Sequence, residues 1–343
     1  MMNYGDFKEY IKENILGELP DIYSEFEVNI RKSMKNNGME LDGLCIHGHD
    51  NISPVIYLNG YYEKYNDGAS LKSIMSEISE CYINNVEHRG LTNDIAENVM
   101  SYENIKGNIF SKLVNTKNNE YMLSERPHTE YEDLSVTYHI MVSKDENGIA
   151  SIPISNDMAK AYGVTAEELD QVARDNMSKD NPMVIRSMGE IMREMIMPDM
   201  FDDAMSKEQA EEMFDEMFPI NEDMKMYVLS NESKVNGAIW MTSPEALEAL
   251  SEKIGGDFFI LPSSIHEVIA VPNDGHGERE LQDMVMSVNQ DQVSLEDRLS
   301  DNVYSYDAKE HKLSLATGDK TLSQDMEQEH TLEEEKKHSG VKH

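Results

Sequence analysis

The sequence has only two cysteines, Cys45 and Cys81, among 343 residues. They form neither a C-x-x-C pair nor any other redox or metal-ligand spacing, so we expect free thiols in a reducing cytosol. Apolar runs are short as well, and none approaches the roughly 18 residues that a membrane helix needs. The first twenty residues carry charges throughout, which argues against a signal peptide. These absences together predict a cytoplasmic protein.

Positive charge is also scarce. The chain has 30 lysines and arginines against 66 aspartates and glutamates, a formal net charge of −36. So acidic a surface repels nucleic acid and anionic membrane, and the basic residues form no cluster along the sequence. We therefore predict neither direct nucleic-acid binding nor membrane association. The excess of carboxylates is explained by solubility alone. The alternative explanation is that the acidic surface mimics nucleic acid and docks onto a basic protein.

No glycine-rich phosphate loop and no G-x-S-x-G elbow occurs in the sequence, so no cofactor is expected. The stretch FFILPSSIHEVIAVP, residues 258–272, still places hydroxyls, an imidazole and a carboxylate close together: Ser263, Ser264, His266 and Glu267. A serine hydrolase needs a hydroxyl within reach of an imidazole, but triads are usually assembled from separate loops. Because Pro262 cannot donate to a strand ladder and serines bond to local backbone, we favour a structural corner. A ligand pocket and catalysis remain the alternatives.

A second candidate is the pair His47 and His49 in CIHGHD. A spacing of two places both imidazoles on one face of a strand, which is a geometry that metal sites use. Asp50 or the distant His139 would supply a third ligand. A polar strand end that leads into a turn explains the same residues, so we predict no metal site.

A third candidate is the charged stretch ERPHTEYED, residues 125–133. Its acidic members are Glu125, Glu130, Glu132 and Asp133, and paired carboxylates of this kind serve acid–base chemistry in enzymes. A run of mixed charge directly before a predicted strand is more typical of a solvated loop. We therefore predict a loop here and assign it no chemistry.

Hairpins followed by helices recur along the chain. KNNG at 35–38 supplies a turn between two segments of alternating polarity, because Asn-Gly tolerates positive φ. Similar strand–turn–strand patterns cover residues 135–155, 226–243, 258–272 and 302–316. Helices follow most of them, with cap signals at Thr165 and at Ser243-Pro244. The pattern predicts an α+β fold in which repeated hairpin-plus-helix modules form mixed or antiparallel sheets.

The same pattern predicts the domain organisation. We expect an N-terminal α+β domain over residues 1–120 and a C-terminal α+β domain over residues 121–316. The second domain should carry a helical insert at about 178–222, in which Val184, Met188, Ile191, Met192 and Met195 form one stripe. The polar stretch 317–343 cannot bury enough apolar surface to offset its ordering entropy, so it is predicted to be a disordered tail.

The predicted insert is rich in methionine and in acid. Twelve of the 25 methionines lie between Met177 and Met226, and residues 199–223 hold ten carboxylates against one lysine. Thioether side chains are flexible and suit adaptable contacts, although a methionine-rich core explains them as well. An ordinary amphipathic helix over 207–218 is the plainer interpretation of the carboxylates. If this acidic segment is instead a docking surface, we predict the following partner-binding residues: Asp202, Asp203, Glu208, Glu211, Glu212, Asp215 and Glu216.

Several blocks of the sequence resemble a family of uncharacterised proteins. Among them are KNNGMELDGLCI, YGVTAEELDQVARDN, FFILPSSIHEVIAVP and EDRLSDNVYSYD, and the likeness runs from about residue 1 to residue 315. The family is a domain of unknown function whose members occur in gut-dwelling Firmicutes, often among mobile-element cargo. The resemblance implies a bacterial cytosolic protein without an established activity, so it carries over no catalytic residues.

Three functional hypotheses follow. The leading one is a non-enzymatic acidic protein that binds a basic host or element protein, such as a nuclease or another nucleic-acid-binding protein. It would act as a mobile-element accessory or anti-defence inhibitor. The alternative is a hydrolase or metal-dependent enzyme that uses Ser264 and His266 or His47 and His49. A third hypothesis is a transcription-linked regulator that binds a small ligand between the hairpin modules.

Overall fold

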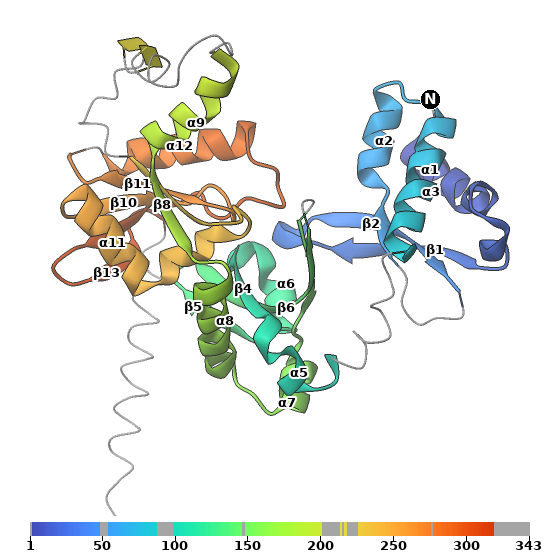
Figure 1. The fold of residues 1–343 in the computed structure, drawn as a ribbon, viewed down its shortest axis with the longest axis horizontal. Coiled ribbons are helices and arrows are strands. Elements are labelled where there is room, and N and C mark those ends of the chain that lie inside the picture. The colour runs from blue at the N-terminus through green and yellow to red at the C-terminus, as the bar shows by residue number, and fades with distance from the viewer. Residues whose placement is uncertain are drawn as a thin grey trace, which may run out of the picture. The chain divides into compact units, whose positions relative to one another are not determined.

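The structure is a computed structural model that describes residues 2–48, 54–87, 99–145, 148–200, 213–214, 216–217, 226–275 and 277–318. The chain divides into two compact units, Met1–Lys106 and Gly107–His343, and each contains helices and antiparallel strands (Figure 1). The predicted α+β class is therefore confirmed. The division falls before β4 (Ile109–Asn115), because this strand pairs with β6 (Leu134–Asp145) of the second unit.

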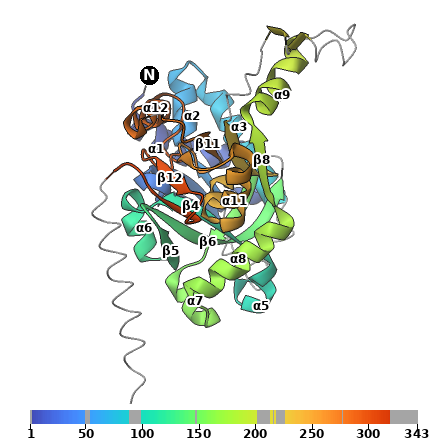
Figure 2. The ribbon, with the colours of Figure 1, turned by 90° about the vertical axis from the view of Figure 1, so that its left-hand side faces the viewer.

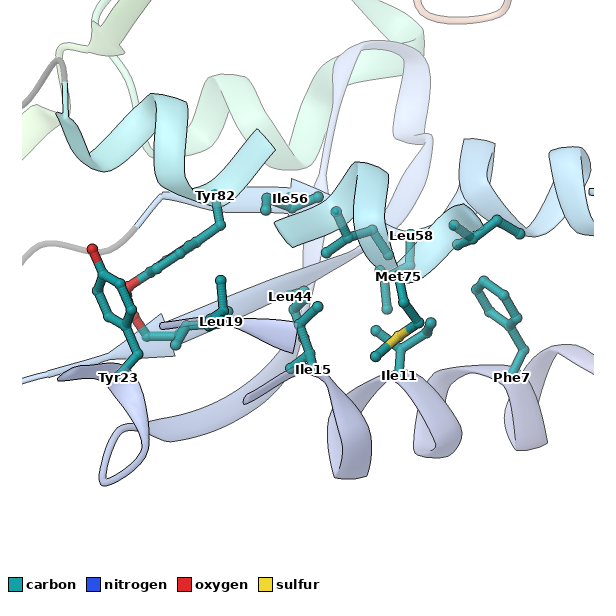
Figure 3. Packing of buried hydrophobic residues seen from close by; sticks show 13 residues of the cluster. Phe7, Ile11, Ile15, Leu19, Tyr23, Leu44, Ile56, Leu58, Met75 and Tyr82 are labelled. Carbon is teal, nitrogen blue, oxygen red and sulfur yellow. Dashed lines mark hydrogen bonds between the residues drawn. The ribbon is translucent and has the colours of Figure 1, made fainter. Parts of the chain in front are cut away.

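An antiparallel sheet and three helices enclose the core of the first unit. The strands β1 (Glu27–Met34), β2 (Glu40–His47) and β3 (Val55–Tyr57) pair in that order, beside α1 (Tyr4–Asn14), α2 (Asn59–Asn66) and α3 (Leu71–Glu87). Figure 3 shows Phe7 and Ile11 of α1 meeting Leu44 of β2 and Met75 of α3 in one buried cluster. The apolar spacing of three and four residues along α1 produces this face. A short helix, α5 (Tyr102–Ile105), lies near the end of the unit.

The turn between β1 and β2 follows the KNNG signal. Asn37 and Gly38 have φ values of 56° and 69°, a left-handed conformation that asparagine and glycine tolerate better than other residues. Val28 and Ile30 on β1 pack against the core of the unit. The predicted hairpin is confirmed, with Met34 opposite Glu40 at the turn.

The smaller sheet of the second unit is built around one long strand. β4 pairs with one edge of β6, while β5 (His128–Tyr131) and β7 (Gly148–Pro153) pair with the other edge. α8 (Ala166–Asp180) crosses one face and buries Leu169, Ala173 and Met177, and the predicted capping box at Thr165 and Glu168 begins it. α6 (Glu120–Ser124) lies on the opposite side of the sheet, and α7 (Asn156–Tyr162) precedes α8 (Figure 2).

The larger sheet of the second unit has six antiparallel strands. Their order is β13 (Lys312–Leu315), β12 (Tyr304–Asp307), β10 (Phe258–Leu261), β11 (Val268–Pro272), β9 (Tyr227–Asn231) and β8 (Met183–Ser187). α12 (Glu278–Asp291) packs Leu281 and Val285 against one face, and α11 (Pro244–Ile254) covers the other (Figure 1). The hairpins predicted at 258–272 and 302–316 are β10–β11 and β12–β13.

Two predictions about this sheet are wrong. Residues 226–243 form no hairpin, because left-handed turns at Lys234 and Asn236 lead into a buried 3-10 helix, η7 (Gly237–Thr242), and β9 pairs instead with β8 and β11. The predicted helical insert also begins with a strand. Met183–Ser187 pairs with β9, so Val184 lies on β8, and α9 (Met188–Met200) starts only after it.

The two sheets of the second unit are joined at Asp133. The Ser300 hydroxyl and the Asn302 amide both donate to Asp133 Oδ2 at 2.8 Å, and the Tyr304 hydroxyl donates to Oδ1. Burial raises the pKa of Tyr304 well above its usual value, and the nearby Asp133 charge adds to that effect. The predicted solvated loop over 125–133 is therefore wrong, because it contains β5 and a carboxylate that ties two sheets together.

Two further predictions concern residues at the margins of the structure. In the ranges described above, no helix is long and apolar enough to span a lipid bilayer. The predicted tail over 317–343 is described only at Thr317 and Gly318, and the rest lies outside the described residues. Thr317 is buried and its hydroxyl accepts the Val303 backbone N–H at 2.8 Å, so the folded part extends at least to this residue.

Candidate functional site at the His266 junction

The predicted corner between β10 and β11 is held by a third segment of chain. Ser264 forms an isolated antiparallel bridge with Arg298. The Ile265 N–H donates to the Asp297 carbonyl at 2.8 Å, and the Leu299 N–H donates to the Ser263 carbonyl at 3.3 Å. The backbone of the corner is therefore paired over several residues, as in a sheet edge.

The His266 side chain connects this corner to two other loops. Its Nδ1 accepts the Asn236 backbone N–H at 3.2 Å, and its Nε2 lies 3.2 Å from Asp297 Oδ1. Because Nδ1 accepts, the hydrogen of the neutral ring sits on Nε2 and is donated to Asp297. Asp297 is held in turn by the Ser294 hydroxyl at 2.7 Å. Both ring nitrogens are thus engaged.

Ser264 does not contact the imidazole ring of His266. Its Oγ accepts the His266 backbone N–H at 3.1 Å, which is a local serine turn. A nucleophilic serine needs a ring nitrogen that accepts its proton. The only such nitrogen of His266, Nδ1, is bonded to Asn236, so this arrangement does not activate Ser264. Glu267 is exposed, and Ser263 takes part through its backbone carbonyl.

The backbone beneath His266 is closely packed. The Ser230 hydroxyl of β9 donates to the His266 carbonyl at 2.8 Å. Asn236, which donates to the ring, has a φ of 56° and precedes Gly237 at the start of η7. Asparagine is one of the residues that adopt this left-handed conformation most readily. The junction therefore fixes the entry to η7 against the larger sheet.

Asn236 is also one of the residues that line a cavity open to solvent. Its walls combine apolar side chains, among them Phe110, Met141 and Met177, with amides. The amide-bearing lining residues are Asn108, Asn176, Asn181, Asn231 and Asn236. Asn181 and Asn231 both bond to the loop at Ser233, which fixes their orientation. Such a lining suits a neutral ligand that has both apolar and hydrogen-bonding groups.

The structure describes only some of the residues considered as metal ligands. His47 ends β2 in the first unit, whereas His139 lies within β6 in the second. His49 and Asp50 lie outside the described residues. Within the ranges that are described, no three His, Cys, Asp or Glu side chains lie close enough to hold a metal ion.

Most of the predicted partner-binding residues also fall in a part of the chain that is not described. These are Asp202, Asp203, Glu208, Glu211, Glu212 and Asp215. Glu216 is described and exposed. The predicted surface can therefore be judged only from the residues around this segment.

Four methionines next to the acidic segment are exposed. Their exposed fractions are 40% for Met192, 71% for Met195, 42% for Met213 and 43% for Met217. Met192 and Met195 lie three residues apart on α9, and the other two lie four residues apart in a helical stretch, so each pair shares a helix face. Phe214 between the latter two is fully buried, and the Arg193 guanidinium of α9 lies 5.4 Å from its ring. We call these four side chains the methionine surface.

Two residues of the junction were missed at the sequence level. Asp297 lies 31 residues after His266 and Asn236 lies 30 residues before it, and no local spacing connects them. The available signals were indirect. Asp297 belongs to the EDRLSDNVYSYD block, and Asn236 stands in an Asn-Gly pair, which favours a left-handed turn.

The junction predicts a structural role for Ser264. Replacing Ser264 with alanine removes one acceptor and should lower the free energy of unfolding of the second unit by about 1 kcal/mol. His266→Ala leaves the Asn236 N–H without its acceptor and removes the bond to Asp297 Oδ1, and it should cost about 2 kcal/mol. Urea unfolding checks both values.

A serine-directed phosphonate probe tests whether the Ser264 hydroxyl is reactive. We expect no labelling of the wild-type chain, because neither ring nitrogen of His266 accepts the Ser264 proton. Labelling that disappears in Ser264→Ala would show that the hydroxyl is activated, contrary to this prediction.

Comparison with known proteins identifies a family. The model of a family of unknown function (DUF5688) matches residues 4–308. Neither a curated protein nor a solved structure matches the chain. The matched range includes the His266 junction, the residues that line the cavity and the methionine surface.

Proposed function

The chain belongs to a family of unknown function, DUF5688, and we propose that it is a non-enzymatic protein that acts by binding a basic partner protein. The observation that carries this proposal is the methionine surface, which lies partly just before and partly within the acidic segment 199–223. Four exposed thioether side chains, two of them more than two-fifths exposed on one helical stretch, are an unusual apolar surface in a chain of net charge −36.

The two properties of this region support binding in different ways. Ten carboxylates in residues 199–223 attract a positively charged surface over a distance and accelerate encounter. Methionine side chains then adapt their shape to the apolar groups of the partner. A partner that offers both basic and apolar side chains, such as an amphipathic basic helix or the groove of a nucleic-acid-binding protein, fits this combination.

The resemblance to mobile-element proteins of gut Firmicutes extends the proposal. In that setting the protein is a cytoplasmic accessory or anti-defence inhibitor, and its partner is a nuclease or another nucleic-acid-handling protein of the host or the element. An acidic surface that occupies a nucleic-acid groove inhibits by competition. The enzymatic alternative is less well supported, because both nitrogens of His266 are occupied at the predicted site.

The partner should be sought with the full chain as bait and two charge variants. In the first variant the seven predicted partner-binding carboxylates are changed to amides. The second, a matched control, changes seven exposed carboxylates elsewhere in the second unit: Glu252, Glu278, Glu280, Asp283, Asp291, Glu296 and Glu310. Both variants lose the same number of negative charges. A difference in their binding therefore shows that the position of the carboxylates matters, and not only the total charge of the chain.

We expect the captured partner to bind the wild-type chain with an affinity that falls steeply between about 50 and 500 mM salt. Such a fall is typical of proteins that bind the phosphates of nucleic acid. At 150 mM salt the first variant should bind roughly tenfold more weakly, about 1.4 kcal/mol, while the control should change little. Equal losses in both variants, or no retained protein at low salt, would contradict the proposal.

A further inference from the structure

Basic side chains gather on one face of the smaller sheet, although the chain as a whole is strongly acidic. Antiparallel pairing places Lys112 of β4 and His128 of β5 on either side of Thr137 in β6. Directly paired residues of this kind point to the same face, with Cβ atoms about 5 Å apart. The next row of the same face pairs Phe110 with His139. Their rings lie 5.7 Å apart.

Arg126 belongs to the same group. It precedes β5, and its carbonyl oxygen lies 2.9 Å from His128 Nδ1. The pKa of His139 lies well below its usual value, first because the ring is buried and then because of the positive charges of Lys112 and Arg126. Two cations, one on β4 and one in the loop before β5, therefore act on one imidazole. We call Lys112, Arg126, His128 and His139 the basic face.

Among the described residues, only the exposed Glu125 carboxylate partly offsets the charge of Arg126. Its side chain is half-buried and makes no hydrogen bond or ion pair with any residue in the described parts of the chain. Burial accordingly lowers the pKa of Arg126, and only the neighbouring Glu125 opposes this. Glu125 and Glu130, the carboxylates beside the basic face in the sequence, are both exposed to water. A desolvated cation without a partner is costly, so it favours an anion.

Hydrogen-bond donors surround the two cations. Lys112 Nζ lies 3.4 Å from the Ser151 hydroxyl of β7, and His139 Nε2 lies 3.1 Å from the Thr137 hydroxyl. His139 is only 8% exposed, and its Nδ1 has no hydrogen-bond partner among the residues that the structure describes. A buried ring nitrogen that lacks a hydrogen-bond partner in the protein is a further group to which a ligand can form a hydrogen bond.

We propose that the basic face binds a phosphoryl-type oxyanion. The two positive charges of Lys112 and Arg126 match a dianion, and the planar guanidinium fork fits two oxygens of a phosphate group. The Ser151 hydroxyl beside Lys112 supplies a further hydrogen-bond donor. The site is distinct from the methionine surface, and it depends on neither the acidic segment nor the partner proposed above.

Calorimetric titration of the full chain with inorganic phosphate tests this site. Ionic strength is held constant with sodium chloride, and sulfate and acetate serve as further probes. We expect saturable binding of phosphate and of sulfate, weaker binding of acetate, and none attributable to chloride. Arg126→Gln and Lys112→Gln should each raise the dissociation constant for phosphate roughly tenfold. Lys309→Gln, an exposed lysine of the same unit, should leave it unchanged.

Two measurements keep the outcome clear. The circular dichroism of each variant shows whether it folds, and Lys112→Gln carries the test if Arg126→Gln does not fold. Phosphate should also shift the ring resonances of His139 in the wild-type chain. The proposal is overturned if phosphate binds no better than chloride at equal ionic strength, or if the folded variants at Lys112 and Arg126 bind it as the wild type does.

Discussion

Replacing Gly237 with alanine should destabilise the second unit by about 3 kcal/mol, the upper end of overpacking costs, and abolish its cooperative unfolding transition at moderate temperature. A Cβ at this position would lie 2.3 Å from Ser230 Oγ, 2.6 Å from the His266 carbonyl oxygen and 2.7 Å from the Asn231 backbone nitrogen. Two of these atoms belong to the backbone, and Ser230 is held by its bond to His266. None of them can move without disturbing β9 or the His266 junction.

Two other glycines provide matched controls for this substitution. Gly107 is in the same unit, and a Cβ there would meet nothing within 4 Å. Gly60 lies inside α2 with the same freedom, so Gly60→Ala should stabilise the first unit by about 0.5–1 kcal/mol. Thermal unfolding of the three variants checks the ranking. A Gly237→Ala protein as stable as Gly107→Ala would show that the chain does not pass this close to His266.

Replacing Asp133 with alanine should cost about 3 kcal/mol, because it leaves several donors without an acceptor between the two sheets. Ser300 and Tyr304 are both buried and both donate to this carboxylate, as does the amide of Asn302. Asp133→Asn keeps the shape and one acceptor oxygen, so it should cost less than the alanine variant. Chemical denaturation of the full chain gives the two values.

A double-mutant cycle distinguishes the direct interaction of Asp133 with Tyr304 from a general loss of packing. Tyr304→Phe removes one donor and keeps the ring, and we expect it to couple to Asp133→Ala by about 1 kcal/mol or more. Asp291→Ala, at the exposed end of α12, is the control and should change stability by less than about 0.5 kcal/mol. Strict additivity of Asp133→Ala and Tyr304→Phe would contradict a direct bond between the two side chains.

Much of the fold could be predicted from the sequence because its signals are local. Asn37-Gly38, the capping box at Thr165 and the Ser243-Pro244 helix start all lie where the patterns placed them. The prediction failed at 226–243, where an apolar segment after β9 reads equally well as a strand. Its actual conformation depends on the left-handed turn at Asn236 and on burial between other elements, which are tertiary effects.

The candidate sites were harder to predict than the fold. His266 was singled out correctly as part of a polar corner, but its partners Asn236 and Asp297 are about thirty residues away on either side. The basic face was even harder to predict from the sequence. Lys112 lies on β4 and Arg126 in the loop before β5, so no cluster of positive charge is visible along the chain. Only strand pairing and register bring these groups together.

The proposal of a basic partner is tested most directly by mapping where that partner touches the chain. Hydrogen exchange of the full chain, with and without the captured partner, reports protection segment by segment. We predict that protection appears in α9 and in residues 199–223 and that it weakens as salt rises. Protection confined to other segments, or a footprint that salt does not change, would contradict binding through the acidic, methionine-rich region.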